Sequence, residues 1–123
     1  MNRKRIFINF SNHPSAQWSE AQLAASQAYG EAIDLPFPQV NPNMSEKELQ
    51  ALSSKYVEMI LAMADGNQVT VHIMGEMTFT FLVVTRLKEL GIQCVSSTTE
   101  RNTFMTDDGK KVSEFKFVRF REY

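Results

Sequence analysis

Three short polar segments, each directly after a run of apolar residues, contain the groups of this sequence best suited to bind a ligand. They are Ser11-Asn12-His13-Pro14, Gly75-Glu76-Met77-Thr78 and Ser97-Thr98-Thr99-Glu100-Arg101. If the apolar runs are parallel strands, these segments lie at the carboxyl ends of the strands, where open α/β sheets bind their ligands. Their hydroxyls, amides and positive charge would suit an anion.

The segment from Ser97 to Arg101 is the richest of the three, with three hydroxyls, a carboxylate and a guanidinium in five residues. The planar guanidinium of Arg101 could bind two oxygens of a phosphate at once. The same residues could also form a capped turn with an exposed ion pair, which would contribute little stability. Both interpretations stay open at this point.

Gly75 differs from the other glycines because no turn or helix end requires it. Gly30, Gly66 and Gly91 are expected to end helices, and Gly109 to make a hairpin turn. Gly75 falls at a strand-to-helix junction, where a missing side chain lets a ligand approach the backbone and free helix amides favour a phosphate. The alternative is a tight turn without a ligand.

The two histidines have different expected roles. His13 could act as a general acid or base, or donate to a phosphate, although a histidine before proline is more often solvated or structural. His72 lies in the apolar run Val69–Ile73 and is expected to be a packed strand residue. Two histidines and one cysteine make no recognisable metal set, and no nucleophile elbow appears. We therefore expect no metal and no cofactor.

Helix signals place three helices that would position these segments. Ser19 with Gln22 and Ser45 with Glu48 predict capping boxes for helices that end at Gly30 and Gly66. A third helix is expected from about Met77 to Leu90. Alanines at four positions are expected on the inner side of the first helix: Ala21, Ala24, Ala25 and Ala28.

Four apolar runs between the helices predict strands, and a hairpin is expected to follow them. The strands are Arg5–Phe10, Ala32–Leu35, Gln68–Met74 and Ile92–Ser96, and Asp108-Gly109 would join Asn102–Thr106 to Val112–Arg121. This alternation predicts one α/β domain, residues 1–123, with a Rossmann-like, mostly parallel sheet, helices on both faces and a C-terminal antiparallel hairpin. The aromatic residues of the last strand change face midway, so either a bulge shifts the register or both faces are covered.

Charge and composition limit the classes of partner. Thirteen basic and 14 acidic residues give a formal net charge of −1, which provides no field for binding duplex nucleic acid or an anionic membrane. No apolar stretch approaches the length of a membrane span. The single cysteine, Cys94, excludes an internal disulfide and fits a reducing, cytoplasmic compartment.

The C-terminal half, together with Asn9-Phe10-Ser11-Asn12-His13, resembles a known family. Val71–Glu76, Ser97–Arg101 and the tail Phe117–Tyr123 are similar to the small stand-alone CRISPR-associated proteins of the ring-nuclease group. The resemblance implies a Rossmann-like fold akin to CARF domains, a homodimer, and binding of cyclic oligoadenylate second messengers. It covers the second half of the chain well and the first half loosely.

Some members of that group cleave the messenger, and the resemblance assigns roles on that basis. The ribose 2′-hydroxyl can attack the adjacent phosphate without a metal if the site holds the geometry and stabilises the developing charge. Arg101 would stabilise the transition state, Ser11 or Thr98 would orient the phosphate, and His13 would transfer a proton. The alternatives are a non-catalytic sensor or sink for the same messenger, and an unrelated Rossmann-type nucleotide-binding module.

Overall fold

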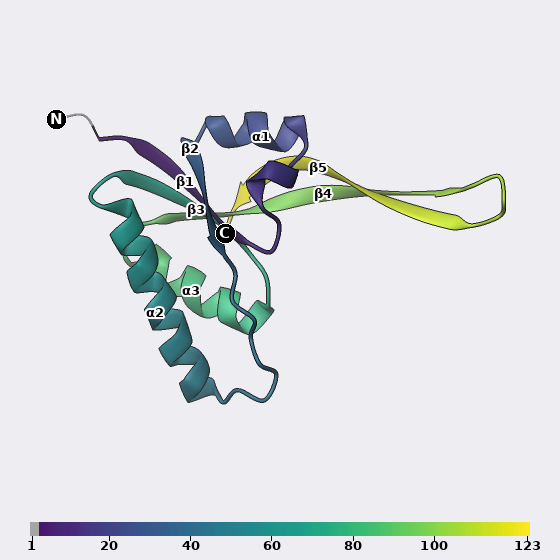
Figure 1. Ribbon diagram of the computed structural model, residues 1–123. Coiled ribbons are helices and arrows are strands. Elements are labelled where there is room, and N and C mark those ends of the chain that lie inside the picture. The colour runs from purple at the N-terminus through teal and green to yellow at the C-terminus, as the bar shows by residue number, and fades with distance from the viewer. Residues whose placement is uncertain (1–2) are drawn as a thin grey trace.

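A computed structural model describes residues 3–123 (Figure 1), so the first two residues of the expected domain lie outside the described part. Five strands and three α-helices make up the fold, together with one short 3-10 helix, η1. In chain order they are β1 (Arg5–Ser11), η1 (Ser15–Gln17), α1 (Glu20–Gln27), β2 (Glu31–Pro36), α2 (Glu46–Ala64), β3 (Gln68–Met74), α3 (Met77–Glu89), β4 (Gln93–Met105) and β5 (Lys111–Glu122). Between residues 3 and 123 no helix is long and apolar enough to cross a membrane.

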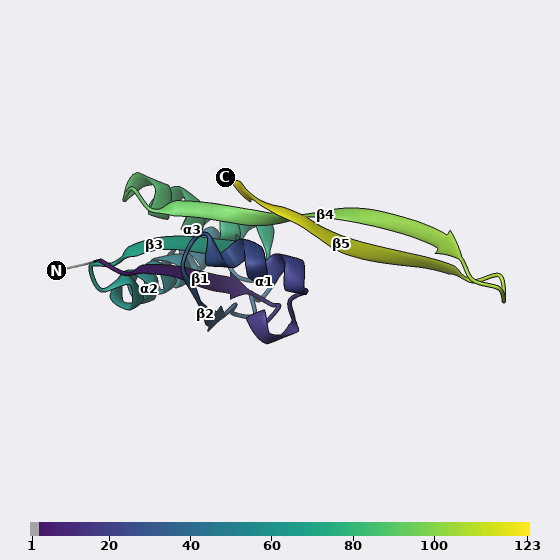
Figure 2. The ribbon, with the colours of Figure 1, turned by 90° about the horizontal axis from the view of Figure 1, so that it is seen from above.

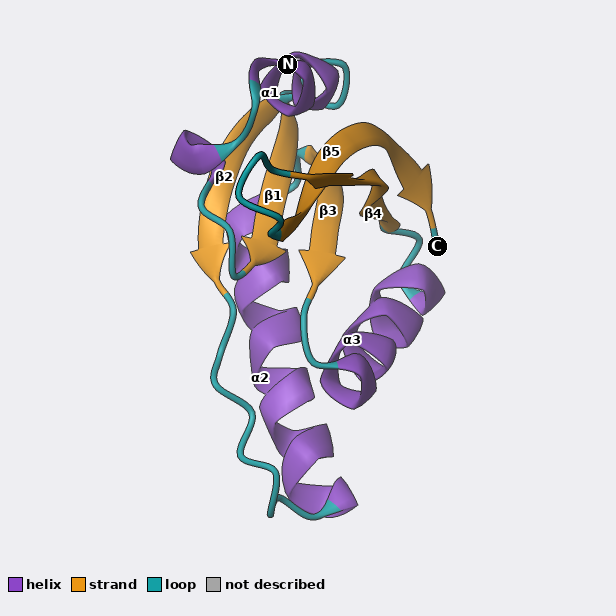
Figure 3. Ribbon diagram, turned by 90° about the vertical axis from the view of Figure 1, so that its right-hand side faces the viewer, coloured by secondary structure: helices purple, strands orange, loops and turns teal. Residues whose placement is uncertain are grey.

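The strands form one sheet in the order β2-β1-β3-β4-β5. The first four are parallel and β5 is antiparallel to β4. Figure 3 shows α1 on one side of the sheet and α2 and α3 on the other. The α/β class, the mostly parallel sheet and the C-terminal antiparallel pair are therefore confirmed.

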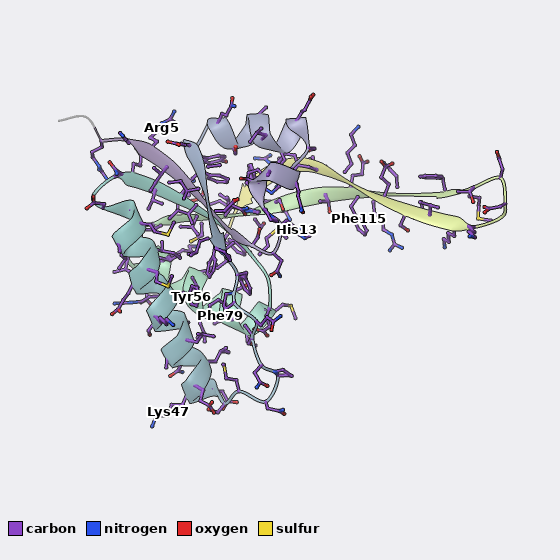
Figure 4. The ribbon with its side chains drawn as sticks, viewed as in Figure 1. Arg5, His13, Lys47, Tyr56, Phe79 and Phe115 are labelled. Atoms are coloured by element: carbon purple, nitrogen blue, oxygen red, sulfur yellow. The ribbon has the colours of Figure 1, made fainter. Side chains whose placement is uncertain are left out.

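Strand β1 lies between β2 and β3 and is buried on both faces. Ile6, Ile8 and Phe10 pack in the larger core beneath α2 and α3, where Tyr56 and Phe79 also lie (Figure 4). Phe7 points to the opposite face and packs with residues of α1 and β5 in a second cluster. Burial on two faces explains why this strand reads as a nearly continuous apolar run.

The helix ends largely follow the expected signals. Ser45 and Glu48 form the complete capping box of α2. At the start of α1 the Ser19 side chain accepts a hydrogen bond from the backbone N–H of Gln22, which is one half of the expected box. The inner side of α1 was predicted wrongly. Of its four alanines only Ala25 packs in the core; Ala21, Ala24 and Ala28 are exposed, and Ser26 is the buried residue.

A second correction concerns the segment Ser97–Arg101, which is not a turn. Strand β4 continues without interruption through it to Met105, because β5 pairs with every residue from Val95 to Met105. Figures 1 and 2 show the resulting β4–β5 ribbon projecting far beyond the helices. We call its outer part, Thr99–Phe117, the arm.

A β-bulge lies where the arm leaves the body. Thr98 pairs with Arg119 and Thr99 with Phe117, so Val118 is left without a partner. The extra residue places Phe117 and Phe120, three positions apart, on one face, with ring centroids 5.0 Å apart. The bulge is therefore the correct one of the two alternatives that the sequence left open.

Candidate functional site

A large cleft lies between α1 and the root of the arm. Its volume is about 930 Å³, and we call it the arm cleft. In Figure 4, His13 lies near the root of the arm and Phe115 lies on the arm. The lining residues used below are Ser11, Asn12, His13, Trp18, His72, Gly75, Ser97, Thr99, Phe115, Lys116 and Phe117.

The arm cleft brings together part of the expected site from all three polar segments. Six expected residues line it: Ser11, Asn12, His13, Gly75, Ser97 and Thr99. The other five, Glu76, Met77, Thr78, Thr98 and Arg101, do not. Glu76 lies instead in a cleft of about 560 Å³ beside the loop Phe37–Pro42, and Met77 in one of about 510 Å³ on α3.

Gly75 has a structural duty that the sequence did not reveal. A Cβ atom at this position would overlap the ring of Phe37, which the loop after β2 lays against the backbone. Phe37 in turn packs on Phe10 and Phe79, with ring centroids 5.1 and 5.2 Å apart. The missing side chain therefore makes room for an aromatic ring of the same chain.

Two of the first amides of α3, those of Thr78 and Phe79, are already occupied. The Glu76 carboxylate accepts from Phe79 N at 2.8 Å and from Thr78 N at 3.1 Å, and the Thr78 hydroxyl also donates to it at 2.7 Å. These hydrogen bonds, Phe79 first, lower the pKa of Glu76. An internal anion thus caps the helix and takes the amides of Thr78 and Phe79, which the sequence had led us to expect free for a phosphate.

Thr98 and Arg101 are also engaged within the protein. The Thr98 hydroxyl donates to Arg119 O at 3.1 Å and accepts from Arg119 N at 3.2 Å, which closes the bulge. The Arg101 guanidinium donates to Ser113 Oγ at 3.2 Å and lies 5.9 Å from the centroid of the Phe115 ring. Arg101 therefore lies along the arm, with Phe115, a cleft-lining residue, directly opposite it.

A hydrogen-bond network across β2, β1 and β3 supports the cleft wall. The parallel registers align Asn9 with Asp34 on one side and with His72 on the other. Asn9 Nδ2 donates to Asp34 Oδ1 at 2.9 Å and to His13 O at 2.8 Å. Because both partners only accept, the orientation of the Asn9 amide is fixed.

The oxygen of the Asn9 amide, Oδ1, accepts hydrogen bonds from two further groups. Ser11 Oγ donates to Asn9 Oδ1 at 2.8 Å, and His72 Nδ1 lies 2.9 Å from the same atom. Since Oδ1 carries no hydrogen, the proton of the second bond belongs to His72 Nδ1. The Ser11 hydroxyl also accepts from His13 N at 3.2 Å, so Ser11 holds the His13 loop in place.

His72 is buried, as the sequence predicted, at 2% exposure. Burial lowers its pKa from 6.5 to about 4, with a further contribution from the charge of His13. Sequence reasoning missed that His72, Asn9, Asp34 and Trp18 belong to the wall or support of the site. The available signal was a polar residue near the middle of each of three apolar strands, but only the register places those three residues side by side.

The fold and the cleft define an α/β protein of Rossmann-like type whose candidate ligand site lies on the α1 side of the sheet. Residues 5–121 match the model described as "Uncharacterized protein MJ1673 family". The chain therefore belongs to the MJ1673 family. No curated protein matches it.

Proposed function

We propose that this protein binds a cyclic oligoadenylate in the arm cleft and cleaves it by metal-independent attack of a ribose 2′-hydroxyl. The observation that supports this most is the convergence of Ser11–His13, Gly75, and Ser97 with Thr99 on one cleft. A volume of about 930 Å³ is large for a small-molecule site. The resemblance of these same segments to ring nucleases supplies the class of ligand.

The lining combines the two kinds of group that a nucleotide needs. Trp18, Phe115 and Phe117 offer aromatic faces on which a base can stack. Lys116 brings a positive charge to the cleft wall. His13 also lines the cleft and is exposed there as an imidazole that can form hydrogen bonds. Together they suit a ligand that carries both bases and phosphates.

Cleavage would proceed by attack of the 2′-oxygen on the adjacent phosphorus. The P–O5′ bond breaks, which leaves a 2′,3′-cyclic phosphate and a 5′-hydroxyl, and one proton moves from the nucleophile to the leaving oxygen through the site. His13 is our candidate for this transfer, because its side chain is exposed in the cleft. Ser11 positions the His13 loop.

A non-catalytic sensor or sink for the same messenger is the second candidate. It is favoured by the internal hydrogen bonds of Ser11, Thr98 and Arg101, the groups expected to orient the phosphate and stabilise the transition state. Binding by stacking and by Lys116 does not require these three groups.

A two-fold dimer belongs to the same proposal, since a ring with repeated phosphates matches a site presented twice. Phe104 and Met105 are large apolar side chains exposed on the arm, and a second protomer would cover them. Light scattering at micromolar concentration, with ligand present, should give the mass of a dimer. A monomer mass would contradict this part.

The test is incubation of the purified protein with cyclic tri-, tetra- and hexa-adenylate, with and without a chelator, followed by chromatography. Linear products that form equally in both conditions support the enzyme, whereas binding without products supports the sensor or sink. His13→Asn should slow cleavage at least tenfold. Absence of both binding and products would refute the proposal.

Arg101 is tested beside a matched control. Arg101→Ala should weaken binding, because its side chain lies on the arm next to the cleft, and should leave the melting temperature nearly unchanged. Arg119 does not line the cleft either, but its guanidinium donates to Phe120 O and not to a lining residue, so Arg119→Ala should bind normally. Equal binding by both variants would remove Arg101 from the site.

A further inference from the structure

Two buried polar atoms of the arm-cleft wall have no hydrogen-bond partner in the described structure. They are His72 Nε2 and Trp18 Nε1. Leaving such groups unpaired in a protein interior costs free energy, and a bound ligand that pairs with them recovers it. The two atoms have complementary needs, because an indole N–H only donates.

The state of His72 Nε2 follows from the other side of its ring. Nδ1 keeps its proton and donates it in a hydrogen bond to Asn9 Oδ1, so in the neutral ring Nε2 carries the lone pair. Asp34 fixes Asn9, which makes Asn9 a positioning residue for the imidazole. The Nε2 atom is therefore an acceptor with a set orientation.

Aromatic packing holds the ring where it is. Its centroid lies 6.1 Å from that of Phe7, 5.2 Å from that of Phe120 and 5.7 Å from that of Trp18. Of these three neighbours only Trp18 lines the cleft. The cleft therefore meets the imidazole on its Trp18 side. Both Nε2 and the indole N–H are closed to solvent there, so a ligand pairs with them only after the Trp18 side chain shifts.

We propose that His72 reads the base of the ligand: Nε2 accepts a hydrogen bond from the 6-amino group of adenine, and Trp18 Nε1 donates to the neighbouring ring nitrogen. This inference rests on the proposed function and identifies the subsite for one base. Adenine presents an amino donor beside a ring acceptor, which matches the two unpaired atoms. Hypoxanthine carries a carbonyl at C6, whose oxygen would face the Nε2 lone pair.

The imidazole of His72 is buried and neutral, which favours a base and not a phosphate as its partner. A protonated imidazole would attract a phosphate, but burial keeps His72 uncharged near neutral pH. A neutral acceptor instead selects for an N–H group. Discrimination by a buried hydrogen bond is strong because the wrong ligand leaves both sides unpaired.

The experiment uses nucleoside monophosphates, so that it tests the base subsite apart from the cyclic messenger. The ¹⁵N resonances of His72 are recorded at pH 7 while adenosine, inosine or cytidine 5′-monophosphate is added. We expect a proton on Nδ1, a change at Nε2 with the adenosine nucleotide, and at least tenfold weaker binding of the inosine nucleotide. A proton on Nε2, no response to any probe, or equal binding of the three nucleotides would overturn the inference.

Variants separate recognition from folding. His72→Phe keeps an aromatic ring and should remove the preference for adenine over hypoxanthine. Should it fail to fold, Asp34→Ala changes an exposed residue and should reduce the preference by removing one of the two acceptors that hold the Asn9 amide group. Thr70→Val is the control, since Thr70 is buried two residues before His72 on the same face and does not line the cleft.

The outcomes for the two proposals differ. If the adenosine and inosine nucleotides are discriminated through His72 but no cyclic oligoadenylate binds, the proposed function fails and the base subsite stands. If cyclic oligoadenylate binds and both His72→Phe and Asp34→Ala keep the full adenine preference, the subsite assignment fails alone.

Discussion

Stability should depend on pH through His72, and the size of the effect follows from its pKa. The folded value is about 4 and the ordinary value is 6.5. Below pH 6.5 the unfolded chain therefore binds more protons than the folded one, so the free energy of unfolding falls as the pH falls. The loss ends near pH 4, where the folded protein also takes up the proton.

The magnitude can be worked out from the same two values. Each pH unit inside this window contributes ~1.4 kcal/mol, and the full window contributes ~3 kcal/mol. Between pH 7.5 and pH 5.0 the expected loss from His72 is ~2 kcal/mol, which is less than the full amount because pH 5.0 still lies above the folded pKa of about 4. This is a large share of the stability of a small domain.

Urea denaturation at a series of pH values measures the effect. The wild-type protein is compared with His72→Phe, and the difference between their free energies of unfolding should change by ~2 kcal/mol from pH 7.5 to pH 5.0. His13→Asn is a useful companion variant, because removing that charge should raise the pKa of His72. A direct NMR titration of His72 gives the folded pKa even if His72→Phe does not fold.

Parallel pH profiles for the wild-type protein and His72→Phe would refute the reasoning. A measured folded pKa near 6.5 would do the same, since burial would then carry no cost for the charged imidazole.

Three further predictions concern local structure and are checked by thermal and chemical melts. Gly75→Ala should lower the free energy of unfolding by ~1–3 kcal/mol, because the new Cβ overlaps the ring of Phe37. In a chain that also carries Phe37→Leu, the Gly75→Ala substitution should destabilise the protein less. An unchanged free energy of unfolding would mean that the loop moves away without cost. Gly91→Ala should cost ~1 kcal/mol, because φ is +78° there and nothing lies within 4 Å of the added Cβ; a cost below ~0.3 kcal/mol would contradict this reasoning. Ser45→Ala removes the N-cap of α2 and should cost ~1 kcal/mol, against which an unchanged melt would count.

Local signals in the sequence were enough to define the fold class. The capping box of Ser45 and Glu48, the helix stop at Gly91 and the turn at Asp108-Gly109 act over a few residues, so their chemistry can be read along the chain. The apolar alternation between these points predicted the parallel sheet and the C-terminal hairpin. The cap, the helix stop and the turn are stabilised mainly by neighbours in sequence.

The candidate site was predicted only in part, because several of its residues pack or pair with residues that are distant in sequence. Ser97–Arg101 reads as a polar turn, yet pairing with β5 makes it strand. Nothing near Gly75 in the sequence requires a glycine. The requirement comes from the ring of Phe37, in a loop about forty residues earlier, which packs against the Gly75 backbone. In both cases the deciding partner is distant in sequence.

The chain alone therefore determined most of the elements and the place of two polar segments, at the carboxyl ends of β1 and β3, whereas pairing with β5 decided that the third lies along β4. Only the tertiary structure decided which side chains remain available. Strand register brings Asp34, Asn9 and His72 into one hydrogen-bonded row and leaves His72 Nε2 unpaired in the cleft wall. Register is set by the packing of whole strands against helices on both faces, a sum over many contacts that no short pattern encodes.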